Sequence, residues 1–151
     1  MQITHALSNY YLDIETTGLN SQINKIITIQ YARLDDSSSK QIGELKILKE
    51  WESSEKEILK EFIIDSSITN SNPFSFVPVG FNLQFEHNFF IQRCKANGLE
   101  PIDIMTKPLI DLRSFGVIMN HGKFKGSGLD QITGKSHNGS IIPQWYYQKN
   151  Y

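Results

Sequence analysis

The chain has 151 residues, a length that fits one compact domain and leaves little room for a second. Hydrophobic residues make up 39% and charged residues 21%, which excludes disordered, collagen-like and membrane-embedded chains. Cys94 is the only cysteine, so an internal disulfide and every zinc site built on paired cysteines are excluded. The N-terminus lacks a basic stretch followed by an apolar one, and we therefore expect a cytoplasmic protein with no membrane partner.

The net charge of −1 is unevenly distributed along the chain. Residues 1–76 carry 7 Lys and Arg against 11 Asp and Glu, whereas residues 77–151 carry 8 against 5. A modest basic patch in the second half could follow a phosphate backbone. An ordinary solvated surface explains the same charges, so charge alone does not decide between the two.

The first third of the chain predicts three strands joined by short connections. The segments Asn9–Glu15, Lys25–Asp35 and Gln41–Glu50 are rich in residues that favour strands, and turn residues separate them. Three successive strands of this kind predict an antiparallel meander.

Helical and strand patterns alternate in the rest of the chain. The expected elements are a helix that begins after Ser54, a strand over Val77–Phe81, and helices over Gln84–Asn97, Leu109–Met119 and Leu129–Thr133. Strands first, followed by a helix–strand–helix run, predict a mixed α/β domain.

Two carboxylates on the first predicted strand are the main chemical signal. Asp13 and Glu15 are two residues apart, so their side chains project from the same face of the strand. Neighbouring carboxylates repel unless a cation lies between them or one takes a proton. A hard divalent ion such as Mg²⁺ prefers carboxylate oxygen, and a pair of ions about 3.5–4 Å apart suits phosphodiester hydrolysis. The pair alone is weak evidence for a metal site, because the polar face of any half-exposed strand can carry two carboxylates in this way.

A third carboxylate lies where the fourth predicted strand passes into a helix. Residues 80–90 read GFNLQFEHNFF, which places Glu86 in the first helical turn, where it could face back toward Asp13 and Glu15. The helix dipole alone also favours a carboxylate at this position. Asn82 has a similar structural alternative as the residue that caps the helix.

Together, residues 11–20 (YLDIETTGLN) and 80–90 resemble the first two motifs of the DEDD superfamily of 3′–5′ exonucleases. The family's first motif is an apolar strand with D-x-E followed by T-T-G-L, which stands here over residues 13–19. Its second motif ends in Phe-Asp at a helix start, and here Glu86 replaces the usual Asp. The resemblance implies one exonuclease-like domain over residues 1–151 with an α/β, ribonuclease H-like fold. That fold is a mixed β-sheet, an antiparallel three-stranded meander plus parallel strands, flanked by helices.

The resemblance also implies an activity and a set of site residues. The implied activity is metal-dependent hydrolysis of phosphodiester bonds at the 3′ end of single-stranded DNA or RNA, with two Mg²⁺ or Mn²⁺ ions. The implied catalytic and metal-binding residues are Asp13, Glu15 and Glu86. The implied substrate-binding residues are Thr16, Thr17, Gly18, Leu19, Asn82 and Phe85. Leu19 would wedge against the terminal base and Phe85 would stack, although the spacing of Phe85 from Phe89 is more typical of core packing.

The family's third motif does not match. In the family the last metal-binding Asp follows a Tyr by four residues or a His by five, on a C-terminal helix. Here Ile142 follows His137 by five, Tyr151 follows Tyr147 by four, and no carboxylate side chain occurs beyond Asp130. Three explanations are open: the chain is truncated and lacks the final helix, three carboxylates suffice, or full activity has been lost.

These explanations lead to an alternative function and to a further partner. The alternative is a catalytically silent ribonuclease H-like module that binds nucleic acid or protein. If the final helix is absent, exposed apolar sheet surface predicts a homodimer. Asp111 lies where the family often carries an Asp that is not a ligand, so it could support the ligands indirectly. A position on a helix surface beside Arg113 is the alternative that we expect.

Overall fold

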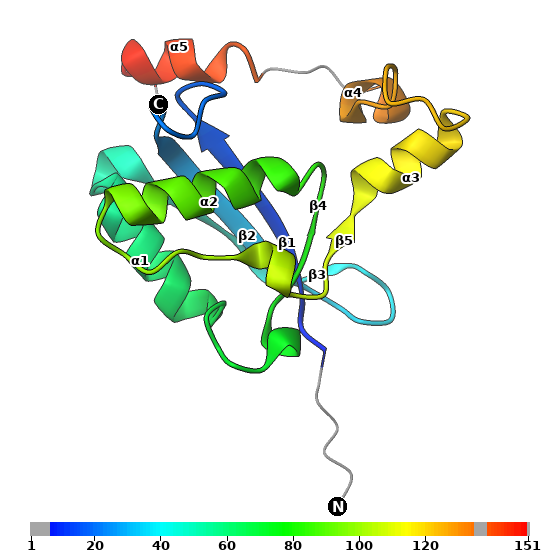
Figure 1. The fold of residues 1–151 in the computed structure, drawn as a ribbon, viewed down its shortest axis with the longest axis horizontal. Coiled ribbons are helices and arrows are strands. Elements are labelled where there is room, and N and C mark those ends of the chain that lie inside the picture. Colours follow the sequence, from blue (N-terminus) through cyan, green and yellow to red (C-terminus); the bar gives the residue numbers. More distant parts are fainter. Residues whose placement is uncertain (1–6, 135–138, 151) are drawn as a thin grey trace, which may run out of the picture.

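The computed structural model describes residues 7–134 and 139–150, within which five strands form one mixed sheet (Figure 1). The strands, in the spatial order β3-β2-β1-β4-β5, are β3 (Gln41–Lys49), β2 (Ile26–Leu34), β1 (Asn9–Thr16), β4 (Val77–Gly80) and β5 (Ile110–Asp111). The first three strands are antiparallel, while β4 is parallel to β1 and β5 is parallel to β4. The predicted meander and the predicted mixed α/β sheet are both confirmed.

Helices flank this sheet (Figure 1). They are α1 (Glu55–Ser66), α2 (Gln84–Ala96), α3 (Leu112–Met119), α4 (Leu129–Thr133) and α5 (Ile142–Tyr147), with short 3-10 turns η1 (Glu50–Glu52), η2 (Pro73–Ser75) and η3 (Ile104–Thr106). Helices α1 and α2 lie on one face of the sheet, α3 and α4 continue from β5, and α5 contacts β1. In the described part of the chain, no helix has the length and apolar character needed to cross a membrane.

The alternation along β1 decides which side chains face the helices. Leu12 and Ile14 are buried in the core cluster, which also contains Phe62 of α1 and Phe90 of α2. Burying a side chain of this size stabilises the fold by about 1.5–3 kcal/mol. Because successive side chains on a strand point to opposite faces, the odd-numbered residues of β1, Asp13 among them, lie on the face away from this core.

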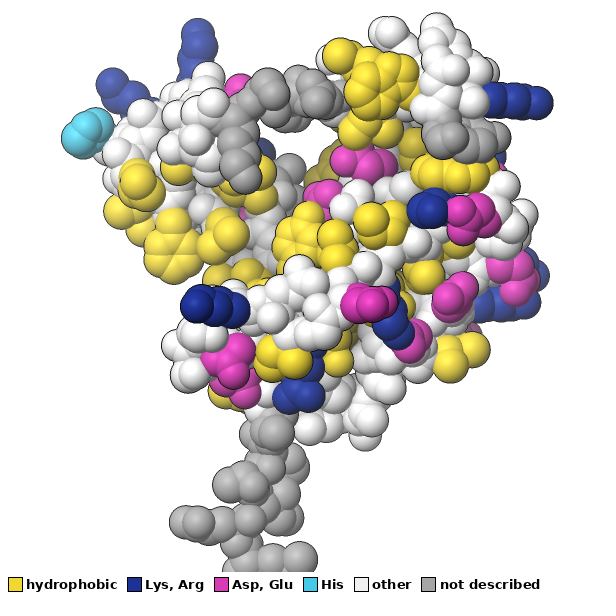
Figure 2. Space-filling view, turned by 180° about the vertical axis from the view of Figure 1, so that it is seen from behind, with side chains coloured by type: hydrophobic (Ala, Val, Ile, Leu, Met, Phe, Trp, Pro, Cys, Tyr) yellow, Lys and Arg dark blue, Asp and Glu magenta, His cyan; other side chains and the backbone are white. Residues whose placement is uncertain are grey.

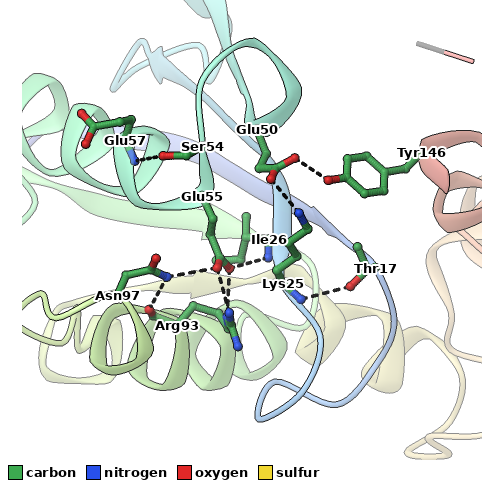
Figure 3. Close-up of polar contacts among 10 residues, drawn as sticks. All are labelled: Thr17, Lys25, Ile26, Glu50, Ser54, Glu55, Glu57, Arg93, Asn97 and Tyr146. Carbon is green, nitrogen blue, oxygen red and sulfur yellow. Dashed lines mark hydrogen bonds and ion pairs between the residues drawn. The ribbon is translucent and has the colours of Figure 1, made fainter. Parts of the chain in front are cut away.

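A buried ion pair fixes α1 and α2 against the sheet (Figure 3). The Glu55 carboxylate accepts hydrogen bonds from Arg93 Nε and Nη2 at 2.9 and 2.8 Å, and from Asn97 Nδ2 at 3.0 Å. It also accepts the backbone N–H of Ile26 at 2.8 Å, which ties α1 and α2 to β2. Removing one partner of such a buried pair costs about 3–5 kcal/mol, so this network holds α2 in place.

The structure corrects one predicted element. The helix expected over residues 109–119 begins only at Leu112, because Ile110 and Asp111 pair with Val79 and Gly80 as the short parallel strand β5. The Asp111 side chain then accepts the backbone N–H of Arg113 at 2.9 Å and caps α3.

Strand β3 forms one edge of the sheet and exposes apolar side chains. Ile42, Leu45 and Ile47 are between 39% and 46% exposed. The homodimer expected from the sequence, over sheet surface left open by an absent final helix, stays a prediction.

Candidate active site

A pocket of about 820 Å³ lies where β1 ends and α2 begins. All three predicted carboxylates line it, together with five of the six predicted substrate-binding residues: Thr16, Gly18, Leu19, Asn82 and Phe85. Parts of α3, α4 and the segment around the start of α5 complete its wall. In Figure 2, acidic side chains lie inside a hollow bordered by hydrophobic ones.

The two carboxylates of β1 are held in an environment that disfavours their charge. Burial raises the pKa of Asp13 to about 6, and a backbone hydrogen bond from Ile14 only partly opposes this rise. Burial followed by repulsion from Asp13 raises the pKa of Glu15 to about 7. Desolvation and a neighbouring like charge are the ordinary causes of such upward shifts.

Glu86 in the first turn of α2 is the most strongly perturbed carboxylate of the pocket. It is 3% exposed, and its Oε2 atom has no hydrogen-bond partner among the described residues. Burial, followed by the charges of Asp13, Asp111 and Glu15, raises the pKa of Glu86 to about 8. A buried carboxylate oxygen without a partner is costly, so this position favours a proton or a cation.

The chemistry of these donors fits a hard divalent cation. All three side chains offer carboxylate oxygen, and none forms an ion pair with a Lys, Arg or His of the described residues. Yet no group of three or more His, Cys, Asp or Glu side chains in residues 7–134 and 139–150 is placed to hold one ion together. An ion here would therefore rely on fewer than three protein ligands, with water or substrate oxygen at its other positions, an arrangement that Mg²⁺ accepts.

The loop after β1 presents Leu19 to the pocket. Leu19 is 88% exposed and lines the pocket. Thr16 Oγ1 donates to the Gly18 carbonyl at 2.7 Å, and a Cβ at Gly18 would meet the Asn24 side chain at 2.7 Å. The tight approach at Gly18 shows why the sequence has no side chain there.

Thr17 does not line the pocket. Its hydroxyl accepts the backbone N–H of Lys25 at 3.0 Å, and its own N–H donates to the Lys25 carbonyl at 3.0 Å (Figure 3). Thr17 thus closes the β1–β2 loop, and the structure gives it a part in shaping the loop.

The turn between β4 and α2 differs from the one that the sequence predicted, both in the residue that precedes the helix and in the side chain that supports the turn. Asn82 has a φ of 65°, in the left-handed region that Asn tolerates better than most residues, and the residue before α2 is Leu83. The Asp111 carboxylate accepts the backbone N–H groups of Asn82 and Leu83 at 2.8 and 3.0 Å. Asn82 is therefore not the residue that caps α2. Asp111 is half-buried and supports this turn, and it does not lie on a helix surface as expected.

Several residues of the pocket were missed by sequence reasoning. Arg113 of α3 and Asp130 of α4 both line it, and Asp130 is the last carboxylate side chain of the sequence. No periodicity links them to Asp13, since their placement depends on how α3 and α4 pack. No motif or spacing in the sequence marked these two residues as part of the site.

The third-motif residues lie only partly within the described part of the chain. His137 and Tyr151 fall outside the described residues. Ile142 at the start of α5 lines the pocket, whereas Tyr147 is 67% exposed and does not.

Tyr146 holds α5 near the pocket (Figure 3). The Tyr146 hydroxyl donates to Glu50 Oε2, and Lys25 Nζ donates to the other oxygen of Glu50 at 2.6 Å. The Lys25 ammonium also lies 5.1 Å from the Tyr146 ring centroid. These contacts tie α5 to η1 and to the start of β2.

Solved structures share this fold. Escherichia coli exonuclease I with a dA16 oligonucleotide matches with a TM-score of 0.60 and 15% identity, over 80% of this chain and 31% of that one. The zinc-bound form of the E. coli exonuclease I complex with single-stranded DNA matches with a TM-score of 0.63 and 15% identity, over 89% and 37%. The chain thus spans about a third of the length of these proteins. No curated protein sequence matches the chain significantly.

A family model described as the RNase_H superfamily matches residues 10–148. The match includes all three predicted carboxylates and extends from β1 to the end of α5. It confirms the ribonuclease H-like fold that the two sequence motifs indicated, and the fold is of a nuclease type. The chain belongs to the RNase H superfamily.

Proposed function

We propose that the chain is a metal-dependent 3′–5′ exonuclease acting on the 3′ end of single-stranded DNA or RNA. One observation carries the proposal: Asp13, Glu15 and Glu86 line one pocket, and the Glu86 Oε2 atom is buried there without a partner among the described residues. The solved exonuclease I structures that share the fold include complexes with single-stranded oligonucleotides, which supports the same class of substrate here.

Asp13, Glu15 and Glu86 would hold two Mg²⁺ or Mn²⁺ ions. Such ions supply positive charge for the phosphodiester oxygens and lower the pKa of water that attacks phosphorus. Asp13, Glu15 and Glu86, once ionised, would hold the positive ions inside the pocket. Arg113 at the wall of the same pocket offers a guanidinium that can neutralise a phosphate oxygen.

The apolar residues of the pocket would position the terminal nucleotide. Leu19 offers an exposed apolar surface, and the Phe85 ring packs against Phe89 with centroids 4.8 Å apart, which fixes its orientation. Contacts of this kind hold any base, because every base has an apolar face. Sequence-tolerant binding of the terminal base is what an exonuclease that acts on any sequence requires.

A second candidate function is a catalytically silent module that binds nucleic acid. The observation in its favour is that no group of three acidic, His or Cys ligands is placed around one ion in the described part of the chain. Such a module would bind a strand through the same pocket without cleaving it.

The deciding experiment is degradation of a 5′-labelled single-stranded oligonucleotide by the purified chain with Mg²⁺, Mn²⁺ or EDTA. We expect a ladder of products shortened one nucleotide at a time from the 3′ end, present with metal and absent with EDTA. Asp13→Asn should lower the rate by about 100-fold or more, since the charge that holds the ions is lost.

A matched control is Glu44→Gln, which removes an exposed carboxylate of β3 outside the pocket. Its rate should equal that of the wild-type chain. Binding of the oligonucleotide without cleavage under every metal condition would contradict the exonuclease and favour the silent module. Equal rates for wild type and Asp13→Asn would point to a contaminating nuclease.

A further inference from the structure

A second pocket of about 590 Å³ adjoins the first. It lies between the β4–α2 turn and α3 and is lined by Asn82, Asp111, Arg113, Ser114, Val117, Ile118 and Phe124. Asn82 and Arg113 line both pockets, so the two hollows share a wall. The two pockets are therefore neighbours at the β4–α2 turn.

The Arg113 side chain is held between the two pockets. Its Nε atom is shielded from solvent and has no hydrogen-bond partner among the described residues. Its guanidinium carbon lies 5.9 Å from the centroid of the Phe124 ring. A buried donor of this kind is costly until it meets an acceptor, and an anion is the acceptor that a guanidinium prefers.

The surface around the second pocket combines positive charge with exposed apolar side chains. Residues 112–129 contain Arg113, Lys123 and Lys125 and no acidic residue. Phe124 is 68% exposed and Ile118 is 72% exposed. In Figure 2, hydrophobic side chains gather on the side of the molecule formed by α3 and α4. Phosphate-binding cations beside an exposed ring are the combination that binds single-stranded nucleic acid.

The packing of α3 keeps this surface in place. Gly116 faces α4 so closely that a Cβ there would meet Ile132 Cδ1 at 2.3 Å. Arg113 and Val117 of the helix held in this way line the second pocket.

We propose that the second pocket binds single-stranded DNA next to its terminal nucleotide, with a phosphate on Arg113 and a base on the Phe124 ring. The inference rests on the proposed exonuclease function, which places the terminal nucleotide in the first pocket. Charge complementarity favours a polyanion over a second copy of the chain. Arg113, Lys123 and Lys125 supply positive charge here, and the Asp111 carboxylate, which also lines the second pocket, is occupied by three backbone N–H groups. Lys123 and Lys125 extend the same positive surface along the strand.

The test compares the binding of 5′-fluorescein-labelled dT2 and dT8 by fluorescence anisotropy, in an Asp13→Asn background that prevents degradation. A dT2 strand fills the first pocket only, whereas dT8 reaches the second. Phe124→Ala should lower the ratio of dT8 to dT2 affinity about tenfold, the loss of one stacked base. Lys123→Ala with Lys125→Ala should lower the slope of log affinity against log salt by about 0.7 for each phosphate that a lysine no longer neutralises.

Two matched controls lie far from the pocket in the fold. Phe74→Ala removes a partly exposed ring from η2, and Lys56→Ala removes an exposed cation from α1. Both should keep the dT8 to dT2 ratio and the salt slope. Circular dichroism of each variant shows whether it retains the fold.

The outcomes separate this inference from the proposed function. An unchanged ratio in Phe124→Ala overturns the second pocket as a DNA site, even if the chain degrades DNA. Equal affinity for dT2 and dT8 before any substitution overturns it as well. A dimer in sedimentation that Phe124→Ala dissociates, without a change in the ratio, assigns the surface to a second copy instead. Tighter binding of rU8 than of dT8 overturns the assignment to DNA. Failure of metal-dependent cleavage with the ratio effect intact would overturn the exonuclease alone.

Discussion

The carboxylate of Asp111 accepts the backbone N–H of Asn82 at 2.8 Å, across 29 residues of sequence. The same side chain accepts the N–H of Leu83 and caps α3 through Arg113. One carboxylate therefore sets the relative position of the turn that leads to Glu86 and the helix that carries Arg113. The two sides of the proposed site are joined at this residue.

Asp111→Ala should destabilise the fold and weaken activity together. Three backbone N–H groups lose their acceptor, and each unsatisfied group costs about 1–3 kcal/mol if it stays buried. Urea unfolding should show a loss of at least about 2 kcal/mol. Asp103→Ala, which removes the cap of the exposed turn η3, is the matched control and should cost less. Equal losses in both variants would mean that Asp111 acts as an ordinary cap.

Glu86→Gln should stabilise the metal-free chain at pH 8.5 but not at pH 4. The pKa of Glu86 rises on folding from 4.5 to about 8, so the folded state binds the proton more tightly than the unfolded state. The contribution of Glu86 to the free energy of unfolding is fully present below its pKa in the unfolded chain and is lost as the pH rises through about 8. Gln carries no charge and avoids that loss.

Urea unfolding in EDTA at the two pH values measures the effect, and we expect a gain of more than about 1 kcal/mol at pH 8.5. Glu44→Gln on the exposed strand β3 should show no such pH dependence. A gain of the same size at both pH values would attribute the effect to packing and not to charge.

Leu19→Ala should raise KM for an oligonucleotide about tenfold with little change in stability, since removing the side chain that supports one base costs about 1–3 kcal/mol. The side chain is 88% exposed, so it contributes little to the packing of the folded protein. Ile23→Ala is the matched control, because Ile23 is 77% exposed in the same loop and does not line the pocket. A similar rise of KM in both variants would indicate a general effect of the loop.

Asp130→Asn tests whether the last carboxylate of the sequence takes part. Asp130 lines the pocket from the first turn of α4, yet its charge is not among the causes of the raised pKa of Asp13 or Glu86. We therefore expect Asp130 to act through water or substrate, with a loss of activity of about 10-fold, smaller than for Asp13→Asn. Single-turnover kinetics measures the cleavage rates of the two variants. A loss of activity in Asp130→Asn as large as in Asp13→Asn would indicate that Asp130 is a direct ligand.

The parts of the site that depend on local pattern could be predicted from the sequence. Alternation on β1 places Asp13 and Glu15 on one face, and a helix start places Glu86 near the strand end; the pocket includes all three. The role of Asp111 could not be predicted in this way, because it depends on a two-residue strand that exists only beside β4. Arg113 and Asp130 reach the pocket through the packing of α3 on α4, which no spacing in the sequence specifies.

The loop between β1 and β2 is closed by its own hydrogen bonds. Asn24 accepts the N–H of Asn20 through its side chain, and its own N–H donates to the Asn20 carbonyl, at 3.0 and 2.8 Å. Leu19 therefore already has the backbone position in which an incoming nucleotide would meet it. The entropy of ordering this segment is lost once, when the protein folds, and not again in each catalytic cycle. An enzyme that must release and rebind a strand end after every cleavage gains speed from a contact surface that needs no rearrangement.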